Sequence, residues 1–378
     1  MSQEPFLPLT RPEIDELTIR GVADVLRSGW LAGGRVAAEF EAALSELFRG
    51  RTVRVFNSGA VTIEVALRML GIDEGHEVIT TPLAWAATAN AVLKVGARPV
   101  FVDIDPTTRL IDPARIEAAI TSRTRAILPM HLAGAPCDLD TIHAIAHVHG
   151  LRVIEDASHA IDASWRGKRI GSFGDYASFS FHASQNITSI EGGCLVLPPD
   201  ADVGLCETLR VQGVTRSGID GVDVDVGGGT SYLTDVAARV GLGQLPRLAA
   251  FTARRRALAQ RYFELLDAIG APEWDVQLPV RDFENPNWHL FQIVLPPQVA
   301  RSTFMQELKD RGIGTGVHYP AMHLFTLYRR LGWKEGDFPH AERIGRSIVS
   351  LPLFPSMEDA DVQRVVEAVD DTLHRLSE

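Results

Sequence analysis

The first two thirds of the chain alternate short apolar runs with longer amphipathic stretches. Apolar runs bounded by turn residues predict buried strands, and the stretches between them predict helices that cross from one strand to the next. The pattern therefore predicts an α/β fold with a large mixed sheet that is mostly parallel. The predicted strands are Val53–Phe56, Glu77–Thr80, Pro99–Ile104, Ala126–Met130, Arg152–Asp156, Tyr176–Phe181 and Gly193–Leu197, and the predicted helices are Thr62–Leu70, Ala86–Val95 and Asp140–His149.

Beyond Ala271 the regular alternation ends, which predicts a separate, smaller α+β domain. We expect a large domain over residues 1–250 and a small domain over residues 251–378. The glycines of Gly218–Gly229 predict a mobile loop. The elements predicted after that loop are one long helix over Asp235–Ile269 with a break near Pro246, a strand over Trp288–Leu295, a helix over Ser302–Gly312 with a serine cap, and a final helix over Asp359–Ser377.

The composition is that of an ordinary globular protein, with 46% hydrophobic and 22% charged residues. A net charge of −11 argues against non-specific nucleic-acid binding, which needs a basic face. No apolar run reaches the length that crosses a bilayer, and the N-terminus lacks the blocks of a signal peptide, so we expect a cytoplasmic protein. Cys137, Cys194 and Cys206 have neither metal-site nor disulfide spacing, which predicts reduced thiols and no metal.

Three positions that follow or end a predicted strand carry candidate chemistry. Small residues in Asn57–Ala60 would let backbone N–H groups approach a phosphate at a helix N-terminus, although a plain capped turn explains them equally well. Asp156 ends an apolar strand, where an aspartate can simply cap a helix. Trp85 offers a flat face for a flat ligand, with core packing as the alternative.

The segment Ser180–Thr188, followed by Glu191–Gly193, resembles the cofactor-lysine segment of the DegT-like (DegT/StrS type) sugar aminotransferases. Ser28–Gly34, Gly312–Pro320 and Leu351–Pro355 are similar to other segments of that family, so the resemblance covers almost the whole chain. It implies a fold-type I aminotransferase with a seven-stranded-type sheet, pyridoxal 5′-phosphate (PLP) as cofactor, and a nucleotide-linked sugar as substrate. It also implies a homodimer in which each pocket borrows residues from the second subunit.

The resemblance assigns roles to individual residues. It implies that the cofactor phosphate is bound at a turn and a serine, that one aromatic stacks on the pyridine ring, that an aspartate faces the ring nitrogen, and that a histidine lies near the ring hydroxyl. The phosphate-binding residues would be Ser58, Gly59, Ala60 and Ser180, the stacking aromatic Trp85, the aspartate Asp156 and the histidine His159. Thr230 would reach the cofactor phosphate from the partner subunit. The substrate-side residues would be Trp30, His318, Tyr319 and His323.

Gln185 stands where that family has the lysine that holds PLP as a Schiff base and shuttles the proton. An amide has no nucleophilic amine and does not titrate in the useful range, so it can do neither. His182 has a suitable pKa, but a displacement of three residues should turn it to another face. None of the lysines looks like a replacement, and all are most simply solvated: Lys94, Lys168, Lys309 and Lys334.

Three hypotheses follow. In the first, the lysine was replaced to trap an intermediate of a sugar aminotransferase. In the second, the chain is a natural homologue that uses PLP or pyridoxamine 5′-phosphate (PMP) non-covalently for other chemistry, such as dehydration, with His182, His159 or the substrate as the proton carrier. In the third, the pocket binds a sugar nucleotide or another metabolite, or serves cofactor-free cyclisation or condensation. The retained Asp156, Trp85 and Ser180 favour a PLP-shaped pocket. Departures from the family pattern at Ala60, Gln212, Thr230 and Tyr232 favour a divergent natural protein. We expect an enzyme whose normal transamination is impaired.

Overall fold

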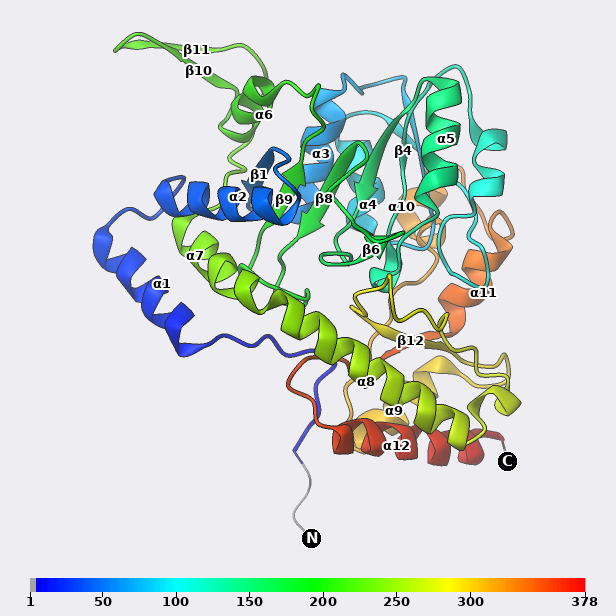
Figure 1. Cartoon of the computed structure of the whole chain (residues 1–378). Helices are drawn as coiled ribbons and strands as arrows, with labels where there is room; N and C mark the ends of the chain where they lie inside the picture. The colour runs from blue at the N-terminus through cyan, green and yellow to red at the C-terminus, as the bar shows by residue number, and fades with distance from the viewer. Residues whose placement is uncertain (1–4, 378) are drawn as a thin grey trace.

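A seven-stranded sheet forms the centre of the molecule, which a computed structural model describes over residues 5–377 (Figure 1). The strand order is β1-β9-β8-β5-β4-β2-β3, and only β9 runs antiparallel to its neighbours. The α/β class with a mostly parallel sheet is therefore confirmed. The strands are β1 (Val53–Phe56), β2 (Glu77–Thr80), β3 (Arg98–Phe101), β4 (Thr124–Leu128), β5 (Arg152–Asp156), β8 (Tyr176–Ser180) and β9 (Gly193–Val196).

Helices cover both faces of this sheet, because successive strand residues point to opposite sides. In β5, Val153 belongs to one core cluster and the next residue, Ile154, belongs to another. One face packs against α2 (Arg35–Leu47) and α5 (Leu139–His149), with α7 (Asp235–Gln244) packed on α2. The other face packs against α3 (Gly59–Met69), α4 (Ala86–Lys94) and α6 (Val203–Arg210), which makes a three-layer fold.

A second apolar core lies in the C-terminal part of the chain and includes Leu7 from the N-terminal segment. Leu248 and Phe251, at the start of α8, belong to the first core, whereas the helix from Leu258 onward belongs to the second. The long α8 thus joins the two cores, and the boundary at residue 250 stays a prediction. The elements of the second core are α8 (Leu248–Ala268), α9 (Arg301–Asp310), α12 (Asp359–Ser377), β12 (Phe291–Val294) and β13 (Ile348–Leu351). Two further helices of the C-terminal part, α10 (Thr326–Arg330) and α11 (Pro339–Ser347), pack against the first core.

Two predicted boundaries in this part are wrong. The strand predicted from Trp288 begins only at Phe291, because Trp288 has a positive φ of 52° that no strand accommodates. The predicted serine cap is also absent: α9 begins at Arg301 after Ala300, so Ser302 lies inside the first turn. The break near Pro246 is confirmed, since a short 3₁₀ turn separates α7 from α8.

The segment predicted as a mobile loop is partly a β-hairpin. β10 (Val214–Ser217) pairs antiparallel with β11 (Gly221–Val224), and the turn between them contains Gly218 at a φ of 65°. The hairpin projects away from the sheet as an arm (Figure 1). The prediction failed for 221–224 because local glycine content hid the alternation of Val222 and Val224, whose side chains are exposed.

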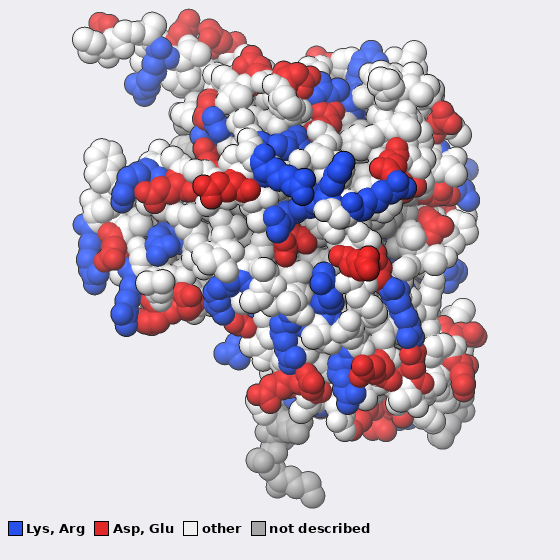
Figure 2. All heavy atoms as spheres, in the orientation of Figure 1, with Lys and Arg blue, Asp and Glu red and all other residues white. Residues whose placement is uncertain are grey.

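Acidic and basic side chains are interspersed on the face drawn in Figure 2, without a broad single-sign area. No helix within residues 5–377 is both long enough and apolar enough to span a membrane. Over the same residues no cluster of histidine, cysteine and carboxylate side chains has the geometry of a metal site.

The buried carboxylate of Asp235 ties the N-terminal helices to the large domain. It accepts hydrogen bonds from the backbone N–H groups of Gly34 at 2.9 Å, Val36 at 3.4 Å and Ala37 at 3.1 Å, at the start of α2. The first amides of a helix have no intrahelical acceptor, and the helix dipole favours a negative charge there. A residue about 200 positions away in the chain therefore caps α2 and fixes its place. The preceding α1 (Glu16–Ser28) also packs on α7.

Replacing Asp235 by alanine should lower the free energy of unfolding by about 2–3 kcal/mol, because three amides lose a charged acceptor at a buried site. Asp235→Asn, which keeps one oxygen acceptor, should lose less. Urea denaturation followed by circular dichroism measures both. Asp225→Ala on the exposed arm is the control. If the alanine variants at 235 and 225 were equally stable, the capping role would be wrong.

Candidate active site

A cavity of about 420 Å³ lies at the carboxyl edge of the sheet, where β1, β5 and β8 end and α3 begins. Open α/β sheets bind ligands at this edge, because loops there follow several parallel strands. Most of the residues singled out from the sequence line this one cavity, although they are spread over the chain. They are Ser58, Gly59, Ala60, Trp85, Asp156, His159, Ser180, His182, Gln185, His318 and Tyr319.

One end of the cavity is built to hold an anion. Ser58 caps α3 by accepting the N–H of Val61 at 3.4 Å, and the first amides of the helix have no acceptor within the helix. The Ser180 hydroxyl lies beside them. A Cβ on Gly59 would stand 2.7 Å from the Cβ of Ser180, so only glycine lets the helix start this close to β8. Backbone amides, a helix dipole and a hydroxyl together suit a phosphate.

Asp156 is a buried carboxylate that is oriented by neutral donors. The Thr88 hydroxyl donates to Oδ2 at 2.6 Å, and Ser158 donates to Oδ1 through its hydroxyl at 2.6 Å and its N–H at 3.2 Å. Asp156 pairs with no cation among residues 5–377, so its negative charge is available to a ligand that carries a positive one. The helix-cap alternative is wrong, since Asp156 ends β5.

Trp85 forms a wall of the cavity and not a part of the core. It is 58% exposed, which rules out the core-packing alternative. Its ring centroid lies 5.7 Å from that of Tyr319 at an interplanar angle of 40°, so its position is supported on one side. An exposed aromatic face beside a buried carboxylate suits a flat, positively charged ring.

Gln185 and His182 both line the cavity because the chain turns back between them. The N–H of Gln185 donates to the carbonyl of His182 at 3.0 Å, which closes a tight turn. The prediction that His182 faces elsewhere is wrong for this reason. Its Nδ1 accepts from Ser184, and its Nε2 lies 3.4 Å from a carboxylate oxygen of Glu191.

The side-chain oxygen of Gln185 is buried and has no hydrogen-bond partner among residues 5–377. A buried polar atom without a partner costs free energy, and in a native fold it calls for an explanation. Its place in the cavity wall supplies one, because a ligand with a hydrogen-bond donor would satisfy it. No lysine lines this cavity.

Three neutral groups form the back of the cavity. His159 accepts the N–H of Ala133 at Nδ1 over 3.3 Å, and its Nε2 lies 3.1 Å from the Tyr319 hydroxyl. His318 bonds the Ser350 hydroxyl over 2.8 Å. Burial lowers the pKa of His159 to about 3 and that of His318 to about 4, so neither is charged near neutral pH.

Three predicted residues lie outside this cavity. His323 is fully buried, and its Nε2 lies 3.0 Å from a carboxylate oxygen of Glu342. The substrate-side prediction is wrong for His323, because its ring faces this internal partner and does not line the cavity. Trp30 is 79% exposed beside a separate hollow next to α1 and α2. Thr230 accepts a hydrogen bond from Gln212 at 2.9 Å, and its reach into a partner's pocket stays a prediction.

Three residues that hold cavity residues in place were not predicted from the sequence: Thr88, Ser158 and Ala133. Thr88 and Ser158 left a faint signal, since each is a hydroxyl residue within three positions of a predicted site residue. Ala133 left none, because it acts through its backbone N–H.

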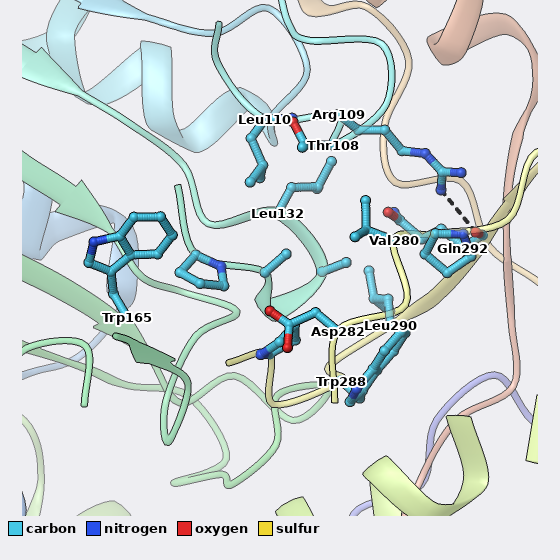
Figure 3. Close-up of a pocket in the computed structure, with 15 residues that line it drawn as sticks. Thr108, Arg109, Leu110, Leu132, Trp165, Val280, Asp282, Trp288, Leu290 and Gln292 are labelled. Carbon is cyan, nitrogen blue, oxygen red and sulfur yellow. Dashed lines mark hydrogen bonds between the residues drawn. The ribbon is translucent and has the colours of Figure 1, made fainter. Parts of the chain in front are cut away.

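A second cavity of about 210 Å³ lies between the turn around Leu132 and the segment that ends at Gln292 (Figure 3). Its walls are mainly apolar and include Trp165 and Trp288. The Arg109 guanidinium extends away from it and donates to the Gln292 carbonyl at 2.9 Å (Figure 3). None of the predicted site residues lines it, so the chemistry gathers in the cavity at the sheet edge.

Comparison with known proteins finds relatives over almost the whole chain. The model of the DegT/DnrJ/EryC1/StrS aminotransferase family matches residues 12–370. The spore coat polysaccharide biosynthesis protein SpsC of Bacillus subtilis is 37% identical over 382 residues, which cover 97% of each chain. Among solved structures, Spr1654 of Streptococcus pneumoniae in its PMP form superposes with a TM-score of 0.92 at 28% identity, covering 99% of this chain and 100% of that one. DesI in the presence of its TDP-sugar product superposes with a TM-score of 0.86 at 29% identity, covering 99% of this chain and 94% of that one.

Gly59→Ala should destabilise the fold by about 1–3 kcal/mol, because a methyl group has no room between α3 and β8. Thermal and urea unfolding measure the loss. Gly227→Ala is the matched control, since a Cβ there would meet its nearest atom at 3.8 Å, an ordinary contact. Equal stability of the two variants would contradict the close approach of the helix to the strand.

Proposed function

This chain belongs to the DegT/DnrJ/EryC1/StrS aminotransferase family, and on that premise we propose that the cavity at the sheet edge binds PLP or PMP without a covalent bond. One observation carries the proposal. An anion-binding helix start, an exposed aromatic face, a buried carboxylate and Gln185 line the same cavity. The membership also supports an enzyme related to the sugar aminotransferases.

The residues present fit a phosphorylated pyridine ring. Ser58, the amides of Gly59 and Ala60, and Ser180 would hold the phosphate. Trp85 would cover the ring, and Asp156 would face its nitrogen. When bound, such a cofactor supplies an electron-withdrawing ring and a nitrogen or aldehyde group for exchange. The carboxylate of Asp156 serves that role by favouring the protonated ring nitrogen.

Gln185 changes what this cavity can do. Its amide can accept and donate hydrogen bonds, so it can contribute to ligand binding. The buried side-chain oxygen has no partner in the described part of the chain and would accept a hydrogen bond from a ligand. The amide cannot form a covalent bond to an aldehyde or carry a proton. Loss of a general acid–base alone costs roughly 10²–10⁴ in rate. We therefore propose that the chain retains cofactor recognition and that ordinary amine transfer through residue 185 is impaired.

A nucleotide-linked sugar is the second ligand that we propose. DesI, solved with a TDP-sugar, and SpsC, a polysaccharide biosynthesis protein, support this class. His318 lies on the cavity wall and could contact such a ligand. Trp30, which precedes α2 in the chain, is exposed to solvent. We also propose a homodimer, in which Thr230 of one subunit approaches the cavity of the other.

The test is cofactor attachment to the wild-type chain and to Gln185→Lys. We expect PLP to bind the wild type, to leave on gel filtration, and to stay unattached after borohydride reduction, because no amine is present at residue 185. Gln185→Lys should retain one cofactor covalently after reduction, read by intact mass, and should show amine transfer from glutamate.

Gln306→Lys makes the same substitution at an exposed position and controls for non-specific attachment of PLP. Asp156→Ala should weaken PLP binding in the wild-type background. Attachment to the wild type, or absence of PLP binding from both the wild type and Gln185→Lys, would contradict the proposal.

A further inference from the structure

The hydroxyl of Tyr319 has an unused proton. Tyr319 lines the cavity and is only 8% exposed, and among residues 5–377 its hydroxyl has a single hydrogen-bond partner, Nε2 of His159 at 3.1 Å. A phenolic hydroxyl both donates and accepts. Which of the two roles it takes toward His159 decides what the cavity offers to a ligand.

The backbone decides that role. A neutral imidazole has one nitrogen that donates and one that accepts. The N–H of Ala133 donates to Nδ1 of His159, so Nδ1 must be the acceptor and the proton must reside on Nε2. His159 therefore donates to the Tyr319 oxygen. The Tyr319 hydrogen is left without a protein acceptor in the part of the chain that the structure describes.

The surroundings keep His159 neutral. Its ring lies against that of His289 with centroids 4.2 Å apart, and Nδ1 of His289 donates to the side-chain oxygen of Asn186 at 2.9 Å. A second proton on either ring would put a positive charge in a buried site, and burial lowers the pKa of both histidines. Asn186 follows Gln185 directly, so the segment that carries the lysine slot also supports the histidine pair.

The hydroxyl keeps its proton for a related reason. Burial, together with the charge of Asp156, raises the pKa of Tyr319 above its usual value. A protonated hydroxyl that already accepts a hydrogen bond is also a better donor, since bonds in a chain polarise one another.

We infer that Tyr319 donates a hydrogen bond to a negatively charged oxygen of the bound ligand, and that Ala133 and His159 are positioning groups that direct this hydroxyl into the cavity. The inference rests on the proposed function, which supplies two oxygens of this kind. One is the ionised ring hydroxyl of PLP or PMP. The other is the carbonyl oxygen of a keto-sugar, which gains negative charge as it reacts. Tyr319 would thus determine which ligands the cavity selects.

Tyr319→Phe tests this, because it keeps the ring beside Trp85 and removes only the hydroxyl. The first probe is PMP alone, followed by fluorescence and by the pH dependence of its absorbance when bound. If the acceptor is the ring hydroxyl, the variant should bind PMP about tenfold more weakly, and the ring hydroxyl should ionise about one pH unit higher. The second probe is a TDP-linked keto-sugar at saturating PMP. A loss confined to this probe would identify the sugar oxygen as the acceptor.

Tyr262→Phe is the matched control, since Tyr262 is a buried tyrosine in the second core whose hydroxyl donates to the Pro352 carbonyl at 2.8 Å. It should bind both probes like the wild type. If Tyr319→Phe also bound both probes like the wild type, this inference alone would fail. If the wild type bound no PMP, the proposed function would fail and the inference with it.

The direction of the hydrogen bond has its own readout. Nitrogen-15 NMR of histidine-labelled protein, with the His159 signal identified by its absence in His159→Gln, should show the proton on Nε2 from about pH 5 to about pH 8. A proton on Nδ1, or a doubly protonated ring in that range, would overturn the inference independently of any ligand.

Discussion

The cavity exists because backbone meets backbone without side chains where α3, β8 and β9 converge. A Cβ on Gly193 would stand 2.7 Å from the Cα of Gly59 and 2.6 Å from the Phe179 carbonyl oxygen. The absence of a side chain at Gly59 and at Gly193 therefore lets α3, β8 and β9 approach one another. This contact sets where the helix begins relative to the sheet edge. The positive end of the helix, the Ser180 hydroxyl and the end of β5 are consequently held within one cavity. The close packing at Gly59 and Gly193 is thus the condition on which the chemical properties of the site depend.

Neutral donors, and not charge pairs, hold Asp156, His159 and His318 in this site. Hydroxyls and an amide orient Asp156, a backbone N–H orients His159, and His318 rests on a serine hydroxyl. A buried ion pair would consume the charge that a ligand needs, whereas a neutral donor leaves it available. None of these contacts involves residue 185, so all of them would be available to the charged, phosphorylated ring that we propose as ligand. Gln185 itself has no amine, and it therefore offers neither a covalent tether nor a proton carrier.

The sequence predicted the sheet and the residues at its carboxyl edge, because both depend on local patterns. Short apolar runs identify strands, and Ser58, Asp156 and Ser180 are found by where those runs end. The errors came from features that only tertiary structure decides. His182 faces the cavity because a turn reverses the chain, and His323 is engaged by Glu342 from another element. The cap that Asp235 places on α2 joins residues too far apart in the chain for any local pattern to reveal.

Two of the residues at which the resemblance predicts a departure from the family pattern touch one another, which bears on the hypotheses for Gln185. Gln212 donates to the Thr230 hydroxyl at 2.9 Å, and the Asn57 amide donates to the Thr230 carbonyl at 3.0 Å, next to the phosphate end of the cavity. Residues in direct contact are energetically coupled, so a change at one alters the cost of a change at the other. A single replacement made to trap an intermediate would leave such a pair untouched. The contact between Gln212 and Thr230 therefore favours the hypothesis of a divergent natural protein over that of a single replacement at residue 185.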